Sequence, residues 1–391
     1  MNNRAHVKRF MNRIIPLALS ALLHSYVGWR LLPALSSVPH LMFSLVVLLL
    51  ASYVLLHLGL QFRRRALRFS DHLSWMSMTA MGLFSSLFVL TLLRDVLLVV
   101  FTLIALAIPF TWLASVTTVS ALAVPVAALL ITAIGMWNAR RTAAVVKIDI
   151  PITDLPDALH GFTIAQITDI HVGPTIKGPY VEDIVSVVNR LNADMVAVTG
   201  DLVDGSVAEL AQHVSPLGKL SSRHGTFFVT GNHEYYSGAH QWIVELRRLG
   251  LRVLLNEHVV LRHDAAALVV AGVTDVTAHH FDPTHLSNPQ GAINNAPDHA
   301  LVRVLLAHQP RSAMDAANAG FHLQLSGHTH GGQFWPWNFF VPLQQPFTAG
   351  LHRLRDLWVY VSRGTGYWGP PKRFGAPSEI TCLRLVRAQI S

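Results

Sequence analysis

The apolar positions of the chain follow two different patterns, which meet near residue 140. Before this point long apolar runs carry few charges, and beyond it short apolar runs alternate with amphipathic ones. A helix needs about 20 apolar residues to cross the ~30 Å hydrocarbon layer of a membrane. Runs of this length at 14–32, 41–60 and 73–93 follow a basic segment at 1–13. Because several runs follow one another, they predict retained transmembrane helices rather than a signal peptide.

Two interpretations are open for residues 96–138. The run 96–113 fits either a further span or a helix in the plane of the membrane, whereas 120–137 is apolar enough to cross alone. The apolar pattern by itself therefore predicts four or five spans.

The basic residues decide between these two counts. They cluster at 4–13, 63–68 and 140–141, and the positive-inside rule places such clusters in the cytoplasm. Only an even number of crossings puts all three clusters on one side. We therefore predict a multi-pass protein of the cell (inner) membrane with four spans and a cytoplasmic soluble domain. Arg94 and Asp95 are then expected near the outer interface as a mutually compensating pair.

Charge is divided between the two regions as unevenly as hydrophobicity. Residues 1–150 hold 13 Lys plus Arg against 3 Asp plus Glu (+10), and the remaining residues hold 17 against 19 (−2). A protein that binds nucleic acid is expected to carry its basic surface on the soluble domain. No nucleic-acid partner is therefore predicted. The single cysteine, Cys382, cannot form an internal disulfide.

The soluble region has the alternating pattern that is typical of an α/β layered fold. Strands are predicted at 162–168, 195–199, 226–230, 252–255, 259–261, 267–273, 301–307 and 321–325, and helices at about 179–191 and 240–249. The predicted domains are a transmembrane region at 1–140, a linker with the first strand at 141–160, and a catalytic domain at 161–391.

Motifs that contain His, Asp or Asn follow five of the predicted strands. They are Asp169-Ile170-His171, Gly200-Asp201, Gly231-Asn232-His233-Glu234, Ala307-His308 and Gly327-His328-Thr329-His330-Gly331-Gly332. Two imidazoles one residue apart can each face a different metal ion. Because the carboxyl ends of successive strands gather at one edge of a sheet, this order of ligands suggests a two-metal phosphoesterase.

The chemistry of phosphate-ester hydrolysis explains these residue types. The reaction requires an oxygen nucleophile at neutral pH and compensation of the charge on non-bridging oxygens, and two divalent ions about 3.5–4 Å apart supply both. Imidazole and carboxylate ligands favour Mn, Fe or Zn, of which we expect Mn, whereas an oxygen-only set favours Mg or Ca. Since no thiolate lies near the motifs, a structural zinc site is not predicted.

Taken together, the five motifs resemble those of the calcineurin-like metallophosphoesterase superfamily. The segment Gly-His-Thr-His-Gly-Gly-Gln at 327–333 is similar to that of its membrane-attached bacterial branch, which includes hydrolases of UDP-diacylglucosamine. The resemblance covers roughly residues 160–388. It implies a layered sandwich of mixed sheets flanked by helices, and hydrolysis by a hydroxide that bridges two metal ions.

The resemblance also implies a role for each motif residue. The first ion would be held by Asp169, His171 and His330, and the second by Asn232, His308 and His328. Asp201 would bridge the two ions, and His233 would face the substrate as general acid or hydrogen-bond donor.

Two further carboxylates lie within the motif region. Asp204 and Glu234 are predicted to orient ligands or to cap turns rather than to bind metal directly. The glycines Gly331 and Gly332 are interpreted as allowing a tight turn or a close approach of backbone amides to a phosphate. The remaining histidines of the domain are interpreted as ordinary surface or core residues, among them His213, His224, His240, His258, His279, His280 and His322.

The substrate is left open between phosphomonoesters, phosphodiesters and pyrophosphates. A membrane tether favours an amphiphilic, lipid-linked substrate, and the lipid bilayer is the other expected partner. The aromatic run 334–340 fits either the core or a loop that contacts lipid. The alternative function is a non-enzymatic membrane protein whose metal domain senses or scaffolds. Its mark would be a missing ligand, and no ligand of the motifs is missing.

Overall fold

The computed structural model describes the chain except for residues 1, 63–69, 108–112, 298 and 389–391. The chain forms two compact units. The first holds Met1–Trp137 together with Gly369–Lys372, and the second holds Asn138–Trp368 and Arg373–Ser391. The first unit is helical and the second is an α/β domain, as the apolar pattern predicts.

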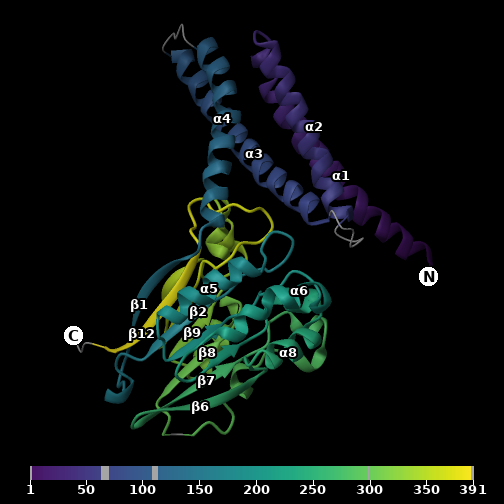
Figure 1. Cartoon of the computed structure of the whole chain (residues 1–391). Helices are drawn as coiled ribbons and strands as arrows, with labels where there is room; N and C mark the ends of the chain where they lie inside the picture. The colour runs from purple at the N-terminus through teal and green to yellow at the C-terminus, as the bar shows by residue number, and fades with distance from the viewer. Residues whose placement is uncertain (1, 63–69, 108–112, 298, 389–391) are drawn as a thin grey trace. The chain divides into compact units, whose positions relative to one another are not determined.

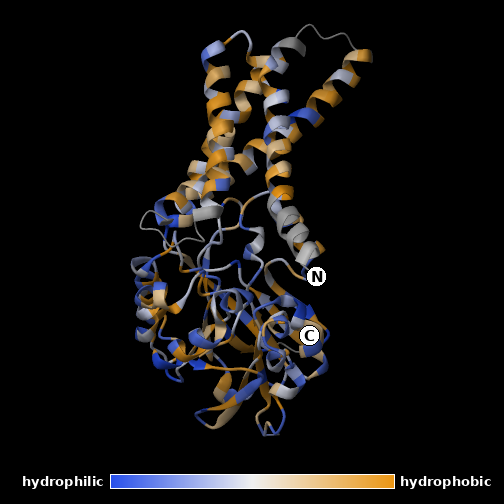
Figure 2. Ribbon diagram, turned by 90° about the vertical axis from the view of Figure 1, so that its right-hand side faces the viewer, coloured by the Kyte–Doolittle hydropathy of each residue, from blue (hydrophilic) through white to orange (hydrophobic). Residues whose placement is uncertain are grey.

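Long apolar helices make up the first unit (Figure 1). They are α1 (Asn2–Leu31), α2 (Pro39–Phe62), α3 (Ser70–Ala107) and α4 (Leu113–Arg140). The hydropathy colouring in Figure 2 shows that much of the length of these helices is hydrophobic. Within the described residues, four helices are long and apolar enough to cross a membrane. Their apolar segments are 14–35, 39–59, 71–106 and 115–140.

The length of α3 bears on the question of a fifth span. This helix runs unbroken from Ser70 to Ala107, so the predicted span 73–93 and most of the run 96–113 belong to a single helix. The basic segment before the first span is part of α1, which begins at Asn2. The predicted basic cluster at 63–68 lies outside the described residues.

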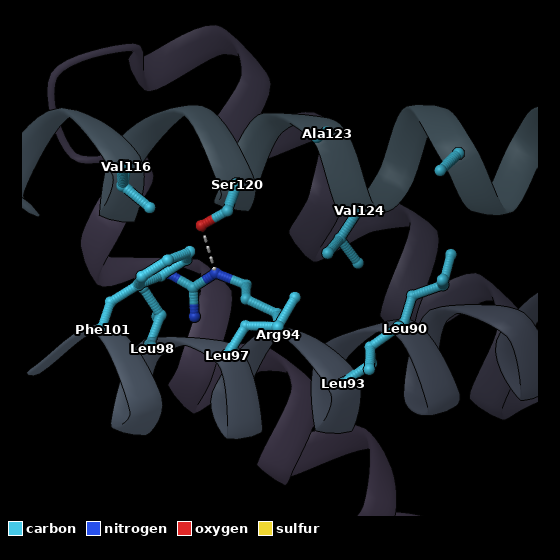
Figure 3. A pocket seen from close by; sticks show the side chains of 11 residues that line it. Leu90, Leu93, Arg94, Leu97, Leu98, Phe101, Val116, Ser120, Ala123 and Val124 are labelled. Atoms are coloured by element: carbon cyan, nitrogen blue, oxygen red, sulfur yellow. Dashed lines mark hydrogen bonds between the residues drawn. The ribbon is translucent and has the colours of Figure 1, made fainter. Parts of the chain in front are cut away.

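A polar network connects α1, α3 and α4. Arg94 and Asp95 form the predicted ion pair at 3.4 Å, but Asp95 also accepts a shorter hydrogen bond of 2.7 Å from Arg30 Nε. The Tyr26 hydroxyl donates to the same carboxylate at 2.6 Å. Arg94 Nε donates to Ser120 Oγ on α4 at 3.0 Å, along one wall of an apolar pocket of about 230 Å³ (Figure 3). Asp95 is therefore compensated by two arginines rather than one.

Two six-stranded sheets form the second unit. The first sheet has the order β1-β12-β2-β3-β4-β5 and the second the order β10-β11-β9-β8-β7-β6. The strands of the first sheet are β1 (Ala144–Ile152), β2 (Thr163–Ile167), β3 (Met195–Val198), β4 (Thr226–Phe228), β5 (Arg252–Val253) and β12 (Glu379–Arg387). Those of the second are β6 (Glu257–His263), β7 (Ala266–Gly272), β8 (Val302–Leu306), β9 (Leu323–Ser326), β10 (Gly350–Leu354) and β11 (Leu357–Val361).

The sheets pack face to face, and helices cover their outer faces. The inner layer contains Ile164, Phe227, Leu268, Leu306 and Leu383. Helices α5 (Gly178–Arg190), α6 (Val207–Val214) and α8 (Ala239–Arg248) bury their apolar sides in a separate core with residues of the first sheet. A third core joins α9 (Pro289–Ala292) and α10 (Ala313–Asn318) to the second sheet. The result is the predicted layered sandwich of mixed sheets flanked by helices.

The strand order brings the motif-bearing strands together. β2, β3 and β4 are parallel neighbours in the first sheet, and β8 and β9 are parallel neighbours in the second. All five strands that precede a predicted motif therefore end at the same side of their sheets. Strands β10, β11 and β12 had no counterpart among the predicted strands.

Candidate metal centre

Loops at the carboxyl ends of five strands supply the candidate ligands. Asp169 and His171 follow β2, Asp201 follows β3, Asn232 follows β4, His308 follows β8, and His328 and His330 follow β9. Side chains that are far apart in sequence are thereby brought together, as the sheet argument predicts. Six of the seven residues that the resemblance singled out as ligands lie close together, and the seventh, Asn232, directly precedes His233, which belongs to one of the same groups.

Besides an overlapping set of His171, Asp201 and His233, two groups of side chains at this place have the geometry of metal sites. Asp169, His171 and His330 form one group, in which His330 Nε2 lies 3.1 Å from His171 Nε2 and 3.4 Å from Asp169 Oδ1. Asp201, His308 and His328 form the other. In this second group His308 Nε2 lies 3.1 Å from Asp201 Oδ2 and 3.2 Å from His328 Nδ1. Each group offers imidazole and carboxylate atoms to one point.

Asp201 belongs to the second group and also approaches the first. Its Oδ2 atom is 3.1 Å from His308 Nε2 and 3.9 Å from His171 Nε2. Its other oxygen, Oδ1, accepts a hydrogen bond of 2.9 Å from the backbone N–H of His233. The carboxylate is thus held in place while one oxygen faces both groups, which is the position that a bridging ligand requires.

Asn232 offers an unsatisfied oxygen atom. Its side-chain Oδ1 is buried and has no hydrogen-bond partner among the described residues. A buried polar atom without a partner costs about 1–3 kcal/mol, so a buried amide oxygen left in this state, in the residue directly before His233, fits a metal ligand. The donor set, with nitrogen and oxygen atoms but no sulfur, fits a divalent ion of the first transition row.

The backbone at the site is strained. Asp169, His171, Asp201, His328 and His330 have positive φ angles of 54°, 56°, 52°, 70° and 52°. For residues other than glycine this left-handed conformation costs about 1–2 kcal/mol each. Such strain persists where the surrounding structure determines the conformation, and here it occurs at five of the residues that form the two groups.

Motif glycines are needed because the backbone packs directly against the carboxylates. A Cβ atom at Gly327 would lie 2.1 Å from Asp169 Oδ2, and one at Gly231 would lie 2.2 Å from Asp201 Oδ1. At Gly332 a Cβ atom would lie 2.3 Å from Asn338 Cα, and φ is +78°. The tight-turn interpretation of Gly332 is thus supported by the close approach of the backbone at Asn338.

Asp204 connects two histidines of the site. Its Oδ1 atom is 3.2 Å from His171 Nδ1 and 2.5 Å from His233 Nδ1. Burial by itself would lower the pKa of His233, but the hydrogen bond to Asp204 and the nearby carboxylates raise it to about 9. Burial would raise the pKa of Asp204, yet the two histidines hold it well below its usual range. Asp204 therefore stays ionised and orients both rings.

Glu234 binds backbone amides. Its carboxylate accepts hydrogen bonds from the N–H groups of Gly231, Asp201 and Leu202 at 2.6, 2.9 and 2.7 Å. It thereby fixes the loop after β3 to the loop after β4, both of which carry candidate ligands. This is the turn-capping arrangement that the sequence predicted for Glu234.

Sequence reasoning missed Arg373. The fully buried guanidinium of this residue donates to the backbone oxygen of His330 at 2.9 Å, and its Nη2 atom lies 3.1 Å from His330 Nδ1. Arg373 thus fixes the position of a candidate ligand from a distance of 43 residues along the chain. No motif surrounds this arginine, and nothing in the local pattern distinguishes it from a surface cation.

Exposed aromatic rings surround His233. The ring centroids of Tyr236 and Trp368 lie 5.2 and 5.8 Å from that of His233. Trp368 is 51% exposed and is held by Gln333, whose side chain bonds both its backbone N–H and its carbonyl oxygen at 2.8 Å. Gln333 leads directly into the predicted aromatic run. Within that run Phe334 is buried, whereas Trp335, Trp337, Phe339 and Phe340 are exposed.

Comparison with known proteins identifies a family and several relatives of this chain. The family model of calcineurin-like phosphoesterases matches residues 162–332. A transmembrane protein with metallophosphoesterase domain from Bos taurus is 40% identical over 280 residues, which cover 68% of this chain and 62% of the relative. The protein of the same description from Danio rerio is 38% identical, with 67% and 63% covered. An uncharacterized metallophosphoesterase of Aquifex aeolicus is 33% identical, with 57% of this chain and 84% of the relative covered.

The fold and the clustered ligands define a membrane-associated α/β protein with a candidate site for divalent metal ions. The chain belongs to the calcineurin-like metallophosphoesterase family. It spans less than two thirds of the length of the two vertebrate relatives. Because the relatives include vertebrate as well as bacterial proteins, the comparisons do not support the predicted restriction to a bacterial branch.

Proposed function

We propose that this chain is a membrane-anchored hydrolase of phosphate esters or pyrophosphates that depends on two divalent metal ions. The observation that carries the proposal is the pair of ligand groups that meet at Asp201, together with the buried and unsatisfied Asn232 Oδ1. A single metal ion would leave one group without a function. Burial of several carboxylates and imidazoles in one place is costly unless cations compensate them.

The proposed ligand sets follow from the two groups. Asp169, His171 and His330 would hold one ion, and Asn232, His308 and His328 would hold the other, with Asp201 shared. Two ions in such a site supply an activated water molecule and offset the charge of the phosphoryl oxygens. Manganese is the ion we expect, since Mn accepts mixed nitrogen and oxygen ligands.

His233 is proposed to act on the substrate. Its Nδ1 atom is bound to Asp204, so its Nε2 atom is the one left to face a substrate. The raised pKa keeps the ring protonated near neutral pH, which suits a donor to the leaving oxygen or to a phosphoryl oxygen. Asp204 would position the ring, because it bonds both His233 and the ligand His171.

An amphiphilic substrate is proposed because of the aromatic surroundings of His233. Tyr236 and Trp368 contact its ring and are 61% and 51% exposed. The run that follows Gln333 adds exposed Trp335, Trp337 and further apolar side chains. Exposed apolar surface of this kind is typical of sites that bind apolar groups, here the acyl or prenyl tail of a lipid-linked phosphate.

The proposed location is the cell membrane, with the phosphoesterase domain in the cytoplasm. Four apolar helices support an even number of crossings. Only three residues separate the end of α4 at Arg140 from the start of β1 at Ala144, so the domain is tethered by a short connection. A tethered site samples substrates at the membrane surface at high effective concentration.

A metal-dependence assay tests the proposed function. The full chain, purified in detergent and stripped by a chelator, is expected to be inactive and to regain hydrolysis on addition of Mn²⁺, with full activity requiring two ions at the candidate metal centre. Phosphomonoesters, phosphodiesters and lipid-linked pyrophosphates form the substrate panel. Full hydrolysis in the chelator-treated protein, or restoration by a single ion per chain, would contradict the proposal.

A further inference from the structure

A second cluster of metal-ligating side chains lies outside the candidate metal centre. It consists of His240 in the first turn of α8, and of Asp282 and His285 at the short helix η5 (Pro283–His285). One ligand atom from each lies within 4.8 Å of the other two. His240 Nε2 is 3.0 Å from Asp282 Oδ2, and His285 Nε2 is 3.9 Å from the same oxygen.

The carboxylate of this cluster is oriented by its own turn. Asp282 Oδ1 accepts hydrogen bonds from the backbone N–H and the hydroxyl of Thr284 at 2.9 and 2.6 Å. The other oxygen, Oδ2, is thereby directed at the two imidazoles. A carboxylate with one oxygen fixed by hydrogen bonds and the other directed at imidazoles has the arrangement found around bound metal ions.

The second imidazole is oriented as well. His285 Nδ1 lies 2.7 Å from the Tyr235 hydroxyl, which is itself 3.3 Å from the Thr230 hydroxyl. Metal-ligating histidines generally bond a polar group through their other ring nitrogen. When Nε2 coordinates a metal, Nδ1–H donates to Tyr235, and the Tyr235 hydroxyl can donate in turn to Thr230. The chain of contacts therefore accommodates the tautomer that metal binding requires.

We infer that His240, Asp282 and His285 bind a divalent ion of the zinc type, with solvent water as the fourth ligand. Zinc bonds of 2.0–2.2 Å in a tetrahedral site place ligand atoms about 3.3 Å apart. The separations of 3.0 and 3.9 Å are close to this value, and His240 can adjust because its side chain is 71% exposed. Two nitrogen ligands out of three disfavour Mg²⁺ and Ca²⁺.

The ion would connect two segments that lie 42 residues apart, by the numbers of His240 and Asp282. Through Tyr235 it would also steady α7 (Asn232–Ser237), the helix that begins with Asn232 and His233. The inference does not depend on the proposed hydrolysis, since it rests on side chains that belong to neither ligand group of the candidate metal centre.

Zinc binding to matched variants of the full chain tests the inference. The wild type and the variants His240→Ala and Asp282→Asn are dialysed in detergent against the same Zn²⁺ buffers, and bound zinc per chain is measured by atomic emission. Both variants are expected to bind one ion fewer than the wild type, because each lacks a ligand. His240 is exposed and Asp282→Asn preserves shape, so folding should be unaffected.

The control is His280→Ala, which removes a neighbouring histidine that lies outside the cluster. It should bind as much zinc as the wild type. With Co²⁺, the difference spectrum between wild type and His240→Ala should show the strong visible bands of four-coordinate cobalt. Equal zinc content in wild type, His240→Ala and Asp282→Asn would overturn the inference, and so would an equal loss in His280→Ala, since that would mean unspecific binding to surface histidines.

Discussion

Asp201 is the residue on which the two-metal proposal depends most directly. The change Asp201→Asn removes the charge that both ligand groups share while preserving the hydrogen bond from His233 N–H. Metal-dependent hydrolysis is expected to fall to background, because an amide compensates neither ion. The effect on the free energy of unfolding should be within about 1–2 kcal/mol, which denaturant unfolding can measure beside the metal content.

A matched control lies at the other end of the same strand. Asp194 precedes β3, where its Oδ2 atom accepts from the backbone and hydroxyl of Thr163. Asp194→Asn should leave turnover unchanged. If Asp201→Asn kept wild-type turnover with both ions bound, the assigned ligand set would be wrong.

Substitution of His233 is predicted to have a different effect. His233 directly follows the proposed ligand Asn232 in the sequence, but it is proposed to act on the substrate rather than to hold a metal ion. General acid catalysis is typically worth about 10²–10⁴-fold, so His233→Ala should lower turnover by that range without loss of metal. The reduction should be smaller for substrates with activated leaving groups, which need less protonation.

The control for this variant is His224→Ala, because His224 lies shortly before β4 and His233 shortly after it. Its ring bonds His263 and takes no part in the site. Turnover of His224→Ala should equal that of the wild type. A parallel loss of metal and turnover in His233→Ala would instead make His233 a ligand.

At the residue scale, the sequence could identify ligands only where a motif marks them. Asp169, Asp201 and His308 each follow a strand and stand beside other motif residues, so their convergence was predictable. Arg373 and the cluster at His240 were not, because both depend on contacts between segments far apart in sequence. His240 is interpreted from the sequence as an ordinary surface residue because it belongs to none of the motifs.

At the element scale, buried strands were easy to recognise and half-exposed ones were not. β3 and β8 are continuous apolar runs between turns, and their predicted bounds agree with the structure to within one residue at each end. β10 is largely half-exposed and carries His352 and Arg353, so its pattern resembles that of a loop. The pairing of β12 between β1 and β2 is a non-local contact, which no local pattern can specify.

The aromatic run 334–340 is an element whose role can be tested separately. Trp335 and Trp337 are 39% and 41% exposed, so Trp335→Ser and Trp337→Ser should cost little stability. The Michaelis constant for a lipid-linked phosphate is expected to rise by roughly tenfold for the double variant, which corresponds to a loss of about 1.4 kcal/mol in binding. A small soluble ester should be hydrolysed as before.

Leu301→Ser provides the comparison, because Leu301 is 57% exposed at the amino end of β8. It should change neither Michaelis constant. Equal effects of the tryptophan variants on the lipid-linked and soluble substrates would assign the run a structural role, and the proposed lipid preference would lose its local support.

At the scale of the whole molecule, the division of charge and the number of helices both bear on how the chain is attached to the membrane. The region before residue 150 has a formal charge of +10 and the rest −2. The soluble domain therefore has no excess of positive charge to attract it to anionic lipid. Its attachment to the membrane depends on the four apolar helices and on the short connection after Arg140.

The orientation of these helices gives the last prediction. Four crossings would place the residues before the first apolar segment and the chain after α4 on one side, and the positive-inside rule predicts that this side is the cytoplasm. In a bacterial host, a reporter that is active only in the periplasm should be inactive when fused after residue 145. The same reporter fused after Ser36, between α1 and α2, should be active and serves as the control. Activity of the reporter after residue 145 would place the phosphoesterase domain outside the cytoplasm. That result would contradict four spans in this orientation and would favour either five crossings or a reversed orientation of four.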